Sequence, residues 1–309
     1  MATPPLPKLQ TARRSRFALR WYSWLLLVAV VAYGVAFAMH WDDRGALWLR
    51  ERFESPSERQ ASIWLPDYRA VIDAKLLPGM EKDEASDLAY DPQTKTLFSV
   101  MGKNPFLVEL TLQGDVLRKI PLVGWSNPEG VTVMGNGLLA IVDEREHMLS
   151  MVKVDATTRE LNRDDFPKYD LGPSKNQNKA FEAVAYDPRR QQILLGEERP
   201  PALFSWKSDG SEILTGDKQK LANDELDIRN LSALAIDPRT GHTLVLSADS
   251  HLLLELDEKG EQVSFMTLLG GFNGLKKTIP RAEGVTMDEA GTLYMVSEPN
   301  LFYRFEKQK

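Results

Sequence analysis

Ser86-Asp87-Leu88-Ala89-Tyr90-Asp91-Pro92 is the first of five copies of one short pattern in this chain. The other copies begin at Glu129, Glu182, Ser232 and Glu283, so the pattern returns at intervals of roughly 43 to 53 residues. Apolar and polar residues alternate within the copies, as they do in a half-buried β-strand. A repeat of this length that is built from short strands is typical of one blade of a β-propeller.

Each copy continues with a turn and further strands. Asp-Pro follows the first strand in three copies and favours a turn, because Asp bonds its own backbone and Pro fixes φ. In four copies a second turn leads to a fourth strand, such as Val116 to Leu122. A β-sandwich is the alternative, but matched turns at matched offsets favour a propeller. We predict an all-β, five-bladed β-propeller over residues 62–309, with six blades as the alternative count.

The strand that closes the ring comes from the start of the domain in this interpretation. The fifth copy reaches Lys309 before any fourth strand, whereas Tyr68 to Leu76 has strand composition and belongs to no copy. Pairing this segment with the last blade would remove the exposed edge that an open sheet leaves. We therefore predict that Tyr68 to Leu76 is the outer strand of the last blade.

An apolar segment precedes the propeller. Residues 21–41 contain no Asp, Glu, Lys or Arg, and a segment of that length can cross a bilayer as a helix. Basic residues precede it, and a basic flank stays in the cytoplasm. The sequence predicts a basic cytoplasmic tail over 1–20, a transmembrane anchor over 21–41 and a stalk over 42–61. A cleaved signal peptide that ends near Ala36-Phe37-Ala38 is the alternative.

Composition excludes several classes of site. The chain has no cysteine, so disulfides and thiolate metal sites are ruled out. Its formal net charge of -6 disfavours nucleic acid as a partner. No Gly-x-Ser-x-Gly elbow, Walker loop or dinucleotide fingerprint is present. The histidines lack metal-ligand spacing: His40, His147, His242 and His251.

Two sets of glutamates occupy repeated positions in the blades. The first set begins the first strand of a blade and the second set follows the second strand: Glu129, Glu182 and Glu283, then Glu144, Glu198 and Glu298. In an antiparallel hairpin the start of one strand lies beside the end of the next. Because the first strand of a blade is innermost, we predict that both sets meet at one mouth of the central channel.

Like charges at close range repel and raise one another's pKa, so gathered acids need a compensating role. Salt bridges with Arg145, Arg199 and Arg281 are one role, and acid–base chemistry by a carboxylate pair is another. Binding of a hard cation is the third, with Ca²⁺ favoured because it takes several oxygen ligands in loose geometry. All six glutamates are therefore candidate Ca²⁺ ligands. Gly130 and Gly284 fit either a close backbone approach or a β-bulge.

Several motifs resemble one family. Asn178-Lys179-Ala180-Phe181-Glu182-Ala183-Val184, Glu197-Glu198-Arg199-Pro200 and Asn230-Leu231-Ser232-Ala233-Leu234 look like the SdiA-regulated family of exported bacterial propellers. The ending Ser297-Glu298-Pro299-Asn300 is the most specific piece, and the likeness spans about 66–306. Two glycines of the family pattern are replaced, by Ala183 and Ala233, which puts a strict glycine requirement in doubt.

The resemblance implies a β-propeller in a bacterial envelope, with metal at the acidic mouth. Together with the N-terminal segment, it predicts a single-pass protein of the inner membrane whose C-terminal domain lies in the periplasm. One functional hypothesis is a membrane-anchored module that binds an envelope ligand or protein through a Ca²⁺ site at the mouth. The alternative is a metal-dependent lactonase or esterase that uses metal-bound water. The sequence leaves open whether the protein is an enzyme.

Overall fold

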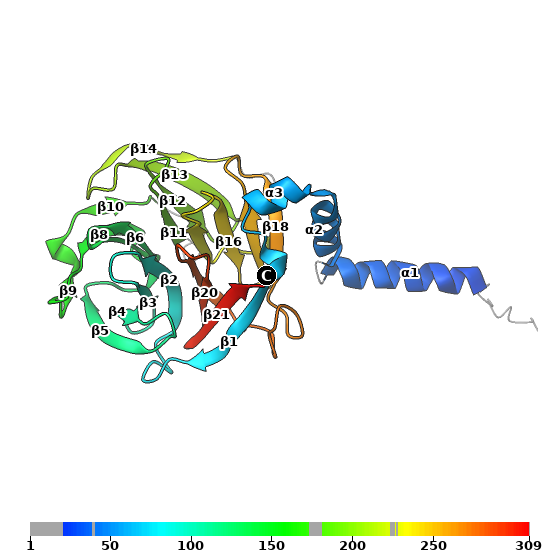
Figure 1. The fold of residues 1–309 in the computed structure, drawn as a ribbon, viewed down its shortest axis with the longest axis horizontal. Helices are drawn as coiled ribbons and strands as arrows, with labels where there is room; N and C mark the ends of the chain where they lie inside the picture. Colours follow the sequence, from blue (N-terminus) through cyan, green and yellow to red (C-terminus); the bar gives the residue numbers. More distant parts are fainter. Residues whose placement is uncertain (1–20, 39–40, 173–180, 223–225, 227, 309) are drawn as a thin grey trace, which may run out of the picture. The chain divides into compact units, whose positions relative to one another are not determined.

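The computed structural model describes residues 21–38, 41–172, 181–222, 226 and 228–308. The basic tail predicted over 1–20, and Asn178-Lys179-Ala180 of the family motif, lie outside the described residues. The chain divides into two compact units, Met1–Ala46 and Leu47–Lys309. All of the β-strands lie in the second unit (Figure 1).

The segment before the propeller is helical. Helix α1 covers Trp21–Ala38 and contains no charged residue, helix α2 covers Trp41–Phe53, and helix α3 covers Pro56–Ala61. Ser55 caps α3, because its hydroxyl accepts a bond from the Glu58 amide and Glu58 binds back to the Ser55 amide. Within the described residues, no helix is both long and apolar enough to cross a membrane. These residues do not support the transmembrane helix predicted over 21–41.

Five antiparallel sheets form the propeller of the second unit, and each contains one copy of the repeat. The last sheet also contains the strand from the start of the domain. The first three, from inner to outer strand, are β2 (Ala85–Asp91), β3 (Thr96–Met101), β4 (Phe106–Leu110), β5 (Val116–Val123); β6 (Pro128–Gly135), β7 (Leu138–Asp143), β8 (Met148–Lys153), β10 (Lys168–Asp170); and β11 (Phe181–Asp187), β12 (Gln192–Glu197), β13 (Ala202–Ser208), β14 (Leu214–Lys220). A short strand β9 (Leu161–Asn162) adds to β5 in parallel.

The remaining two sheets complete the ring. They are β15 (Ala233–Ile236), β16 (Thr243–Ser247), β17 (Leu252–Leu256), β18 (Gln262–Thr267); and β19 (Ala282–Met287), β20 (Leu293–Ser297), β21 (Leu301–Lys307), β1 (Tyr68–Leu76). Each inner strand contacts the inner strand of the next sheet, and β19 contacts β2, so the ring is closed. The five-bladed propeller is confirmed, and the alternative of six blades is wrong.

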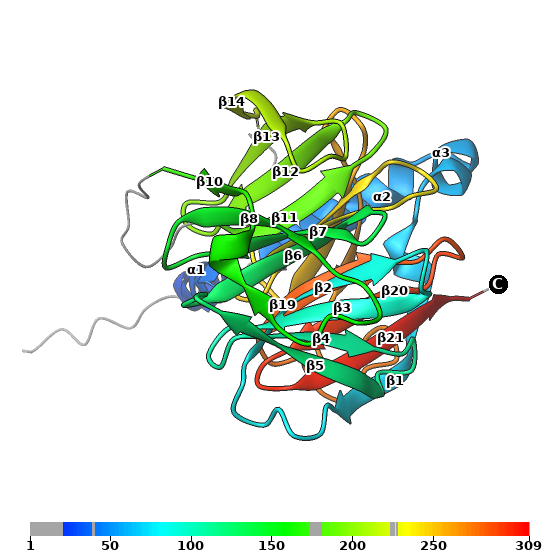
Figure 2. The same cartoon turned by 90° about the vertical axis from the view of Figure 1, so that its left-hand side faces the viewer.

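The closing strand is the one that the sequence predicted. β1 lies beside β21 (Figure 2). The two strands pair in antiparallel register from Tyr68 opposite Lys307 to Leu76 opposite Leu301. The Tyr68 side chain is fully buried, and its hydroxyl donates to the Gly291 carbonyl at 2.8 Å. Pairing and burial therefore both hold the first strand of the domain to the last.

Aspartates start the turns between the first and second strands, as the sequence predicted. The Asp91 carboxylate accepts a hydrogen bond from the Gln93 amide at 2.8 Å, and Asp187 does the same for Arg189 at 3.0 Å. Asp288 accepts from the Thr292 amide at 2.8 Å. Each carboxylate satisfies a backbone donor that the turn would otherwise leave without a partner.

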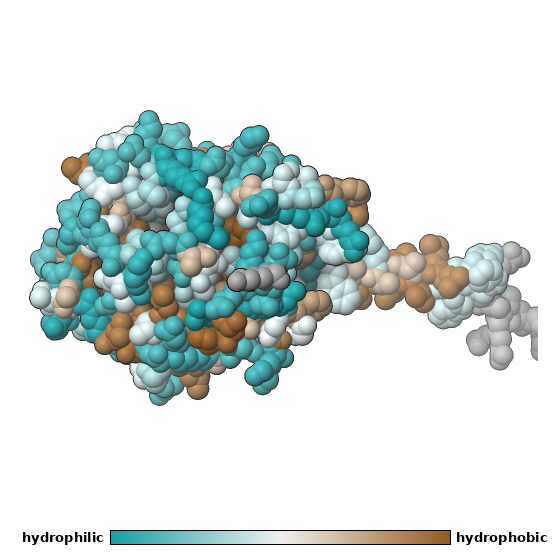
Figure 3. Space-filling model, in the orientation of Figure 1, coloured by the Kyte–Doolittle hydropathy of each residue, from teal (hydrophilic) through white to brown (hydrophobic). Residues whose placement is uncertain are grey.

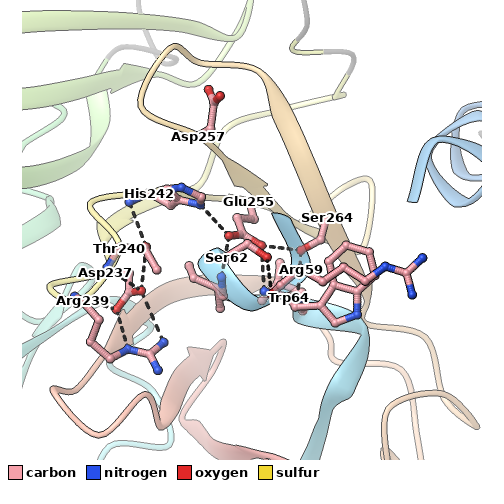
Figure 4. A network of polar contacts seen from close by, with 12 residues as sticks. Arg59, Ser62, Trp64, Asp237, Arg239, Thr240, His242, Glu255, Asp257 and Ser264 are labelled. Atoms are coloured by element: carbon pink, nitrogen blue, oxygen red, sulfur yellow. Dashed lines mark hydrogen bonds and ion pairs between the residues drawn. The ribbon is translucent and has the colours of Figure 1, made fainter. Parts of the chain in front are cut away.

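The chain before β1 packs against strands β17 and β18, and Figure 4 shows the polar contacts that it makes there. The fully buried Glu255 carboxylate accepts hydrogen bonds from the Ile63 amide at 2.7 Å, the Trp64 amide at 3.0 Å and the Ser264 hydroxyl at 2.5 Å. His242 Nδ1 lies 2.7 Å from the same carboxylate. This network fixes residues 63–64 on the propeller just before the chain enters β1.

Candidate functional site

The first residue of the repeated pattern lies at a β-bulge in four of the five blades. The register between first and second strands shifts at Ser86, Glu129, Glu182 and Glu283, each of which lacks a directly paired partner. Ser232, the fifth such residue, stands immediately before β15. A bulge turns a side chain away from the regular alternation of the strand. The three glutamates of the first set thus occupy equivalent, irregular positions at the same end of the inner strands.

Gly130 and Gly284, which follow two of these glutamates, stand where neighbouring inner strands come closest. A Cβ on Gly130 would lie 2.4 Å from the Glu182 carbonyl oxygen, and one on Gly284 would lie 2.7 Å from backbone atoms of Asp87. Both distances are too short for a side chain. The β-bulge and the close backbone approach, which were alternative explanations of these glycines, therefore both apply.

The second set of glutamates lies within electrostatic reach of the first. The members of this set directly follow the second strands of their blades, which are β7, β12 and β20: Glu144, Glu198 and Glu298. Glu144 and Glu298 both raise the pKa of Glu129, and Glu198 raises the pKa of Glu182. The structure thus brings the six predicted glutamates to one mouth of the central channel, while their role as metal ligands stays a prediction.

Burial and mutual repulsion make these carboxyl groups hard to ionise. Burial raises the pKa of Glu129 to about 8, against a hydrogen bond from Ser86 that lowers it. Burial also raises the pKa of Glu283 to about 8, although the Arg281 charge lowers it. The pKa of Glu182 is raised well above its usual range, first by burial and then by the charges of Glu198 and Glu129. The mouth therefore carries an electrostatic cost when its acids are deprotonated.

Arginines offset part of this cost in two blades. Arg281 lies 2.8 Å from Glu298 and 3.4 Å from Glu283, joining one glutamate of each set. Arg199 lies 3.0 Å from Glu198 and also pairs with Asp249. Arg145, the third predicted partner, is exposed and forms no salt bridge with the described residues. The arginine network predicted from sequence is therefore present on only part of the mouth.

Glu182 differs from the others. It accepts no hydrogen bond and forms no ion pair with the described residues, and each influence on its pKa raises it. Glu129 is hydrogen-bonded to Ser86, and no lysine or arginine of the described residues forms a salt bridge with it. The negative charge of the mouth is thus least compensated on the side of β6 and β11.

Two asparagines at the mouth were not predicted. Asn127 donates to Glu144 at 3.0 Å, and its side-chain oxygen, like Ser86 Oγ and Glu129 Oε1, lies within 3.2 Å of where a Gly102 Cβ would stand. Asn230 accepts from the Ser247 hydroxyl and the Asp249 amide, both at 2.9 Å. A signal was available, because each asparagine stands two residues before the first residue of a repeated pattern.

Asp87, which directly follows Ser86, has a structural role that differs from that of the six glutamates. Its fully buried carboxylate accepts a hydrogen bond from the Val131 amide on β6 at 2.8 Å and one from the Leu88 amide at 2.7 Å. Burial raises its pKa well above the usual range. Asp87 therefore joins two neighbouring inner strands.

The donor atoms at the mouth suit a hard cation, although they are not assembled around one. Carboxylate, amide and hydroxyl oxygens are the ligands that Ca²⁺ prefers, and the chain has no cysteine. Among the described residues, no group of three or more His, Asp or Glu side chains is arranged to hold a metal ion. The residues fit calcium by chemical type, and coordination would require their side chains to move together.

A cavity of about 380 Å³ lies away from this mouth. Residues from the far ends of the inner strands line it, including Tyr90, Tyr186, Ile236 and Met287, and none of the six glutamates does. The inner strands thus carry acidic groups at their starts and largely apolar groups at their ends.

The geometry agrees with a match to a known family. A family profile described as SdiA-regulated matches residues 60–306, which covers the whole ring of blades. The chain belongs to the SdiA-regulated family. The resemblance stated from sequence motifs is thereby confirmed.

The most specific motif of this SdiA-regulated protein holds the ring together. Asn300, at the end of Ser297-Glu298-Pro299-Asn300, donates through its side chain to the Leu77 carbonyl at 2.7 Å, and its own carbonyl accepts from the Leu77 amide. The Pro299 carbonyl accepts from the Ala85 amide at 3.0 Å. The motif thus fastens the chain between β1 and β2 while it places Glu298 at the acidic mouth.

Solved structures of similar fold come from distant proteins. A calcium-binding protein, regucalcin, from Agrobacterium tumefaciens strain C58 is 10% identical, with 76% of this chain and 95% of that chain covered and a TM-score of 0.50. A gluconolactonase from Xanthomonas campestris is 12% identical, with 78% and 96% covered and a TM-score of 0.47. A chain of a nidogen/laminin complex is 16% identical, with 69% and 72% covered and a TM-score of 0.48. At such identity the regucalcin likeness extends to the fold alone.

Proposed function

We propose that this SdiA-regulated protein is a binding module of the cell envelope whose acidic channel mouth takes up Ca²⁺ together with an envelope ligand or protein. The observation that supports it best is Glu182, a half-buried carboxyl group without a hydrogen bond or salt bridge to the described residues. A divalent cation would offset the repulsion that raises the pKa of Glu182 and Glu129.

Calcium is favoured over other ions by the ligand types and by the arrangement of the arginines. Glu283, Glu298 and Glu198 already have arginine partners, so the cation would bind on the opposite side, near Glu129 and Glu182. Asn127 and Ser86 supply neutral oxygens close to Glu129. The mixture of carboxylate and neutral oxygens suits the loose geometry of Ca²⁺. The regucalcin likeness adds only that another propeller of this fold is described as calcium-binding.

Calcium titration followed by calorimetry tests the proposal. We expect the wild-type protein to bind Ca²⁺ and Glu182→Gln to bind it about 10- to 100-fold more weakly, by analogy with the loss of other groups that support a metal site. Glu212→Gln, which removes an exposed carboxylate elsewhere, is the matched control and should leave the affinity unchanged. Absence of binding at millimolar Ca²⁺ would leave the arginine-paired network as the better explanation of the mouth.

The same proteins distinguish a binding module from a hydrolase. The sequence offers no histidine convincingly placed as a base, so a metal-dependent lactonase or esterase would need one of the glutamates as its general base. We expect no turnover on a panel of lactones and phosphoesters with or without Ca²⁺. A calcium-dependent rate that disappears in Glu298→Gln, with the fold preserved, would replace the module by an enzyme.

The proposed location rests on the sequence before the propeller. Basic residues up to Arg20 precede the uncharged helix α1, and this order supports a location of the following domain outside the cytoplasm. A reporter that is active only outside the cytoplasm, fused after Lys309, should therefore be active. Activity of a cytoplasm-specific reporter at the same position would contradict this location.

A further inference from the structure

The C-terminal half of helix α2 has two different faces, one packed against the propeller and one exposed. Leu47 packs against the core between blades, and Glu51, which is 8% exposed, accepts a hydrogen bond from the Phe265 amide at 2.8 Å. Phe265 lies on β18, the outer strand of its blade, so Glu51 satisfies a donor on an open sheet edge. Arg59 of α3 donates to the Glu51 carbonyl at 2.9 Å and so joins α3 to the last turn of α2. This face of α2 is therefore fixed to the propeller.

The opposite face of α2 carries three large apolar side chains, each of which is more than half exposed. Trp48 is 51% exposed, Leu49 is 52% exposed and Phe53 is 81% exposed. Residues at these spacings lie on one side of an α-helix, away from Leu47 and Glu51. The Arg52 guanidinium lies 4.5 Å from the centre of the Trp48 ring, so a cation accompanies the aromatic side chain.

The chain that leads into α2 indicates what this face meets. Helix α1 is uncharged from Trp21 to Ala38, and most of its large side chains are exposed, from Trp21 and Leu26 to Val35. Figure 3 shows hydrophobic residues along this segment, whereas the visible face of the propeller is mostly hydrophilic. A helix that is apolar on all sides requires apolar surroundings, which lipid provides. Helix α2 follows α1 after two residues.

We propose that Trp48, Leu49 and Phe53 insert into the surface of a lipid bilayer and so hold the propeller against the membrane; this rests on the proposed location in the cell envelope. Trp and Arg are suited to this depth, because the apolar ring enters the boundary of the acyl chains and the guanidinium reaches the headgroups. The contact is interfacial and does not require a helix that spans the bilayer.

A second copy of the chain fits this face less well than lipid does. A stable protein–protein interface buries on the order of 1,200 Å² or more, contributed by about 20 residues on each side. Three apolar side chains on two turns of helix supply only a small part of such an area. They are enough for a helix that lies in a membrane interface, where each apolar group contributes by itself.

Site-specific labelling of the full-length protein tests the proposal, because the chain has no cysteine of its own. Phe53→Cys and Ile213→Cys would each be labelled with a fluorophore that brominated lipids quench. Ile213 is 64% exposed and lies between β13 and β14, far along the chain from α2, so it is a matched apolar control. Both proteins would be reconstituted in phosphatidylcholine vesicles, with and without phosphatidylglycerol and at low and high salt.

We expect brominated lipid to quench the label at position 53 and not the label at position 213, at both salt concentrations. Adding Trp48→Ser and Leu49→Ser to the Phe53→Cys protein should abolish most of the quenching. Equal quenching at both positions, or none at position 53, would overturn the proposal. Disulfide crosslinking between two copies through position 53 in the absence of quenching would identify this face as a dimer contact instead. Calcium titration of the same proteins reports separately on the channel mouth.

Discussion

Deletion of residues 1–78 is expected to make the propeller aggregate, whereas deletion of residues 1–46 is expected to leave its melting temperature nearly unchanged. The longer deletion removes β1 and exposes the edge of β21 along the whole register from Lys307 to Leu301. It also removes Ile63 and Trp64, which Glu255 binds. The shorter deletion keeps the compact unit that begins at Leu47. An unpaired edge strand is a template for association with other chains.

Thermal unfolding and size-exclusion chromatography of the two truncated proteins measure the difference. Tyr68→Ala gives a milder test that keeps the chain length, because it removes a fully buried ring and its bond to Gly291. Substitution of a large buried aromatic residue by alanine costs about 3–5 kcal/mol of stability. Equal melting temperatures for the two truncated proteins would show that β1 does not stabilise the ring.

Without a bound cation, the propeller is expected to lose stability as the pH rises from about 5 to 8. Glu129 and Glu283 have a pKa of about 8 in the folded protein and an ordinary value of 4.5. The folded state therefore binds more protons than the unfolded state between these values. The resulting stabilisation is complete below pH 4.5 and is lost as the pH rises through 8. For a domain of this size, each lost kcal/mol lowers the melting temperature by about 2–4 °C.

Melting temperatures recorded in chelator across this pH range check the prediction. Glu51, with a pKa raised to about 7 by burial, contributes a loss of the same sign, so the comparison of variants is decisive. The double variant Glu129→Gln, Glu283→Gln should flatten the dependence, while Glu212→Gln should not. Millimolar Ca²⁺ should restore the melting temperature of the wild type at pH 8. A wild-type melting temperature that rises over this range would contradict the assignment of the cost to these acids.

The repeated pattern was sufficient to predict the ring of blades, because each hairpin of a blade is determined by local sequence. Alternating residues and the Asp-led turns set each hairpin, and Tyr68 to Leu76 was recognisable as a strand that lacked a repeat of its own. The docking of α2 was not predictable in the same way. The bond from the Phe265 amide to Glu51 joins positions far apart in sequence, and no local pattern around Glu51 indicates it.

The candidate site likewise has features that the sequence predicted and features that it did not. The meeting of Glu129 with Glu144 and Glu298 followed from the antiparallel order of the strands, and Arg199 and Arg281 found their predicted partners. The bulges at Ser86 and Glu182 were not predicted, because one extra residue leaves the apolar pattern readable on both sides. Whether carboxylates converge on a cation depends on side-chain rotamers, which sequence spacing does not determine.

The pairing of β1 with β21 also sets the order in which the protein can mature. Tyr68 is made before every blade strand from β2 to β21, so the strand that completes the final blade waits for its partner until all of these strands have been made. Closing so long a stretch of chain is entropically costly and slow. Until then the incomplete ring has open strand edges, which favour association with other chains. The export proposed above would benefit from this delay, because an unclosed propeller is still a chain that can be threaded through a narrow pore.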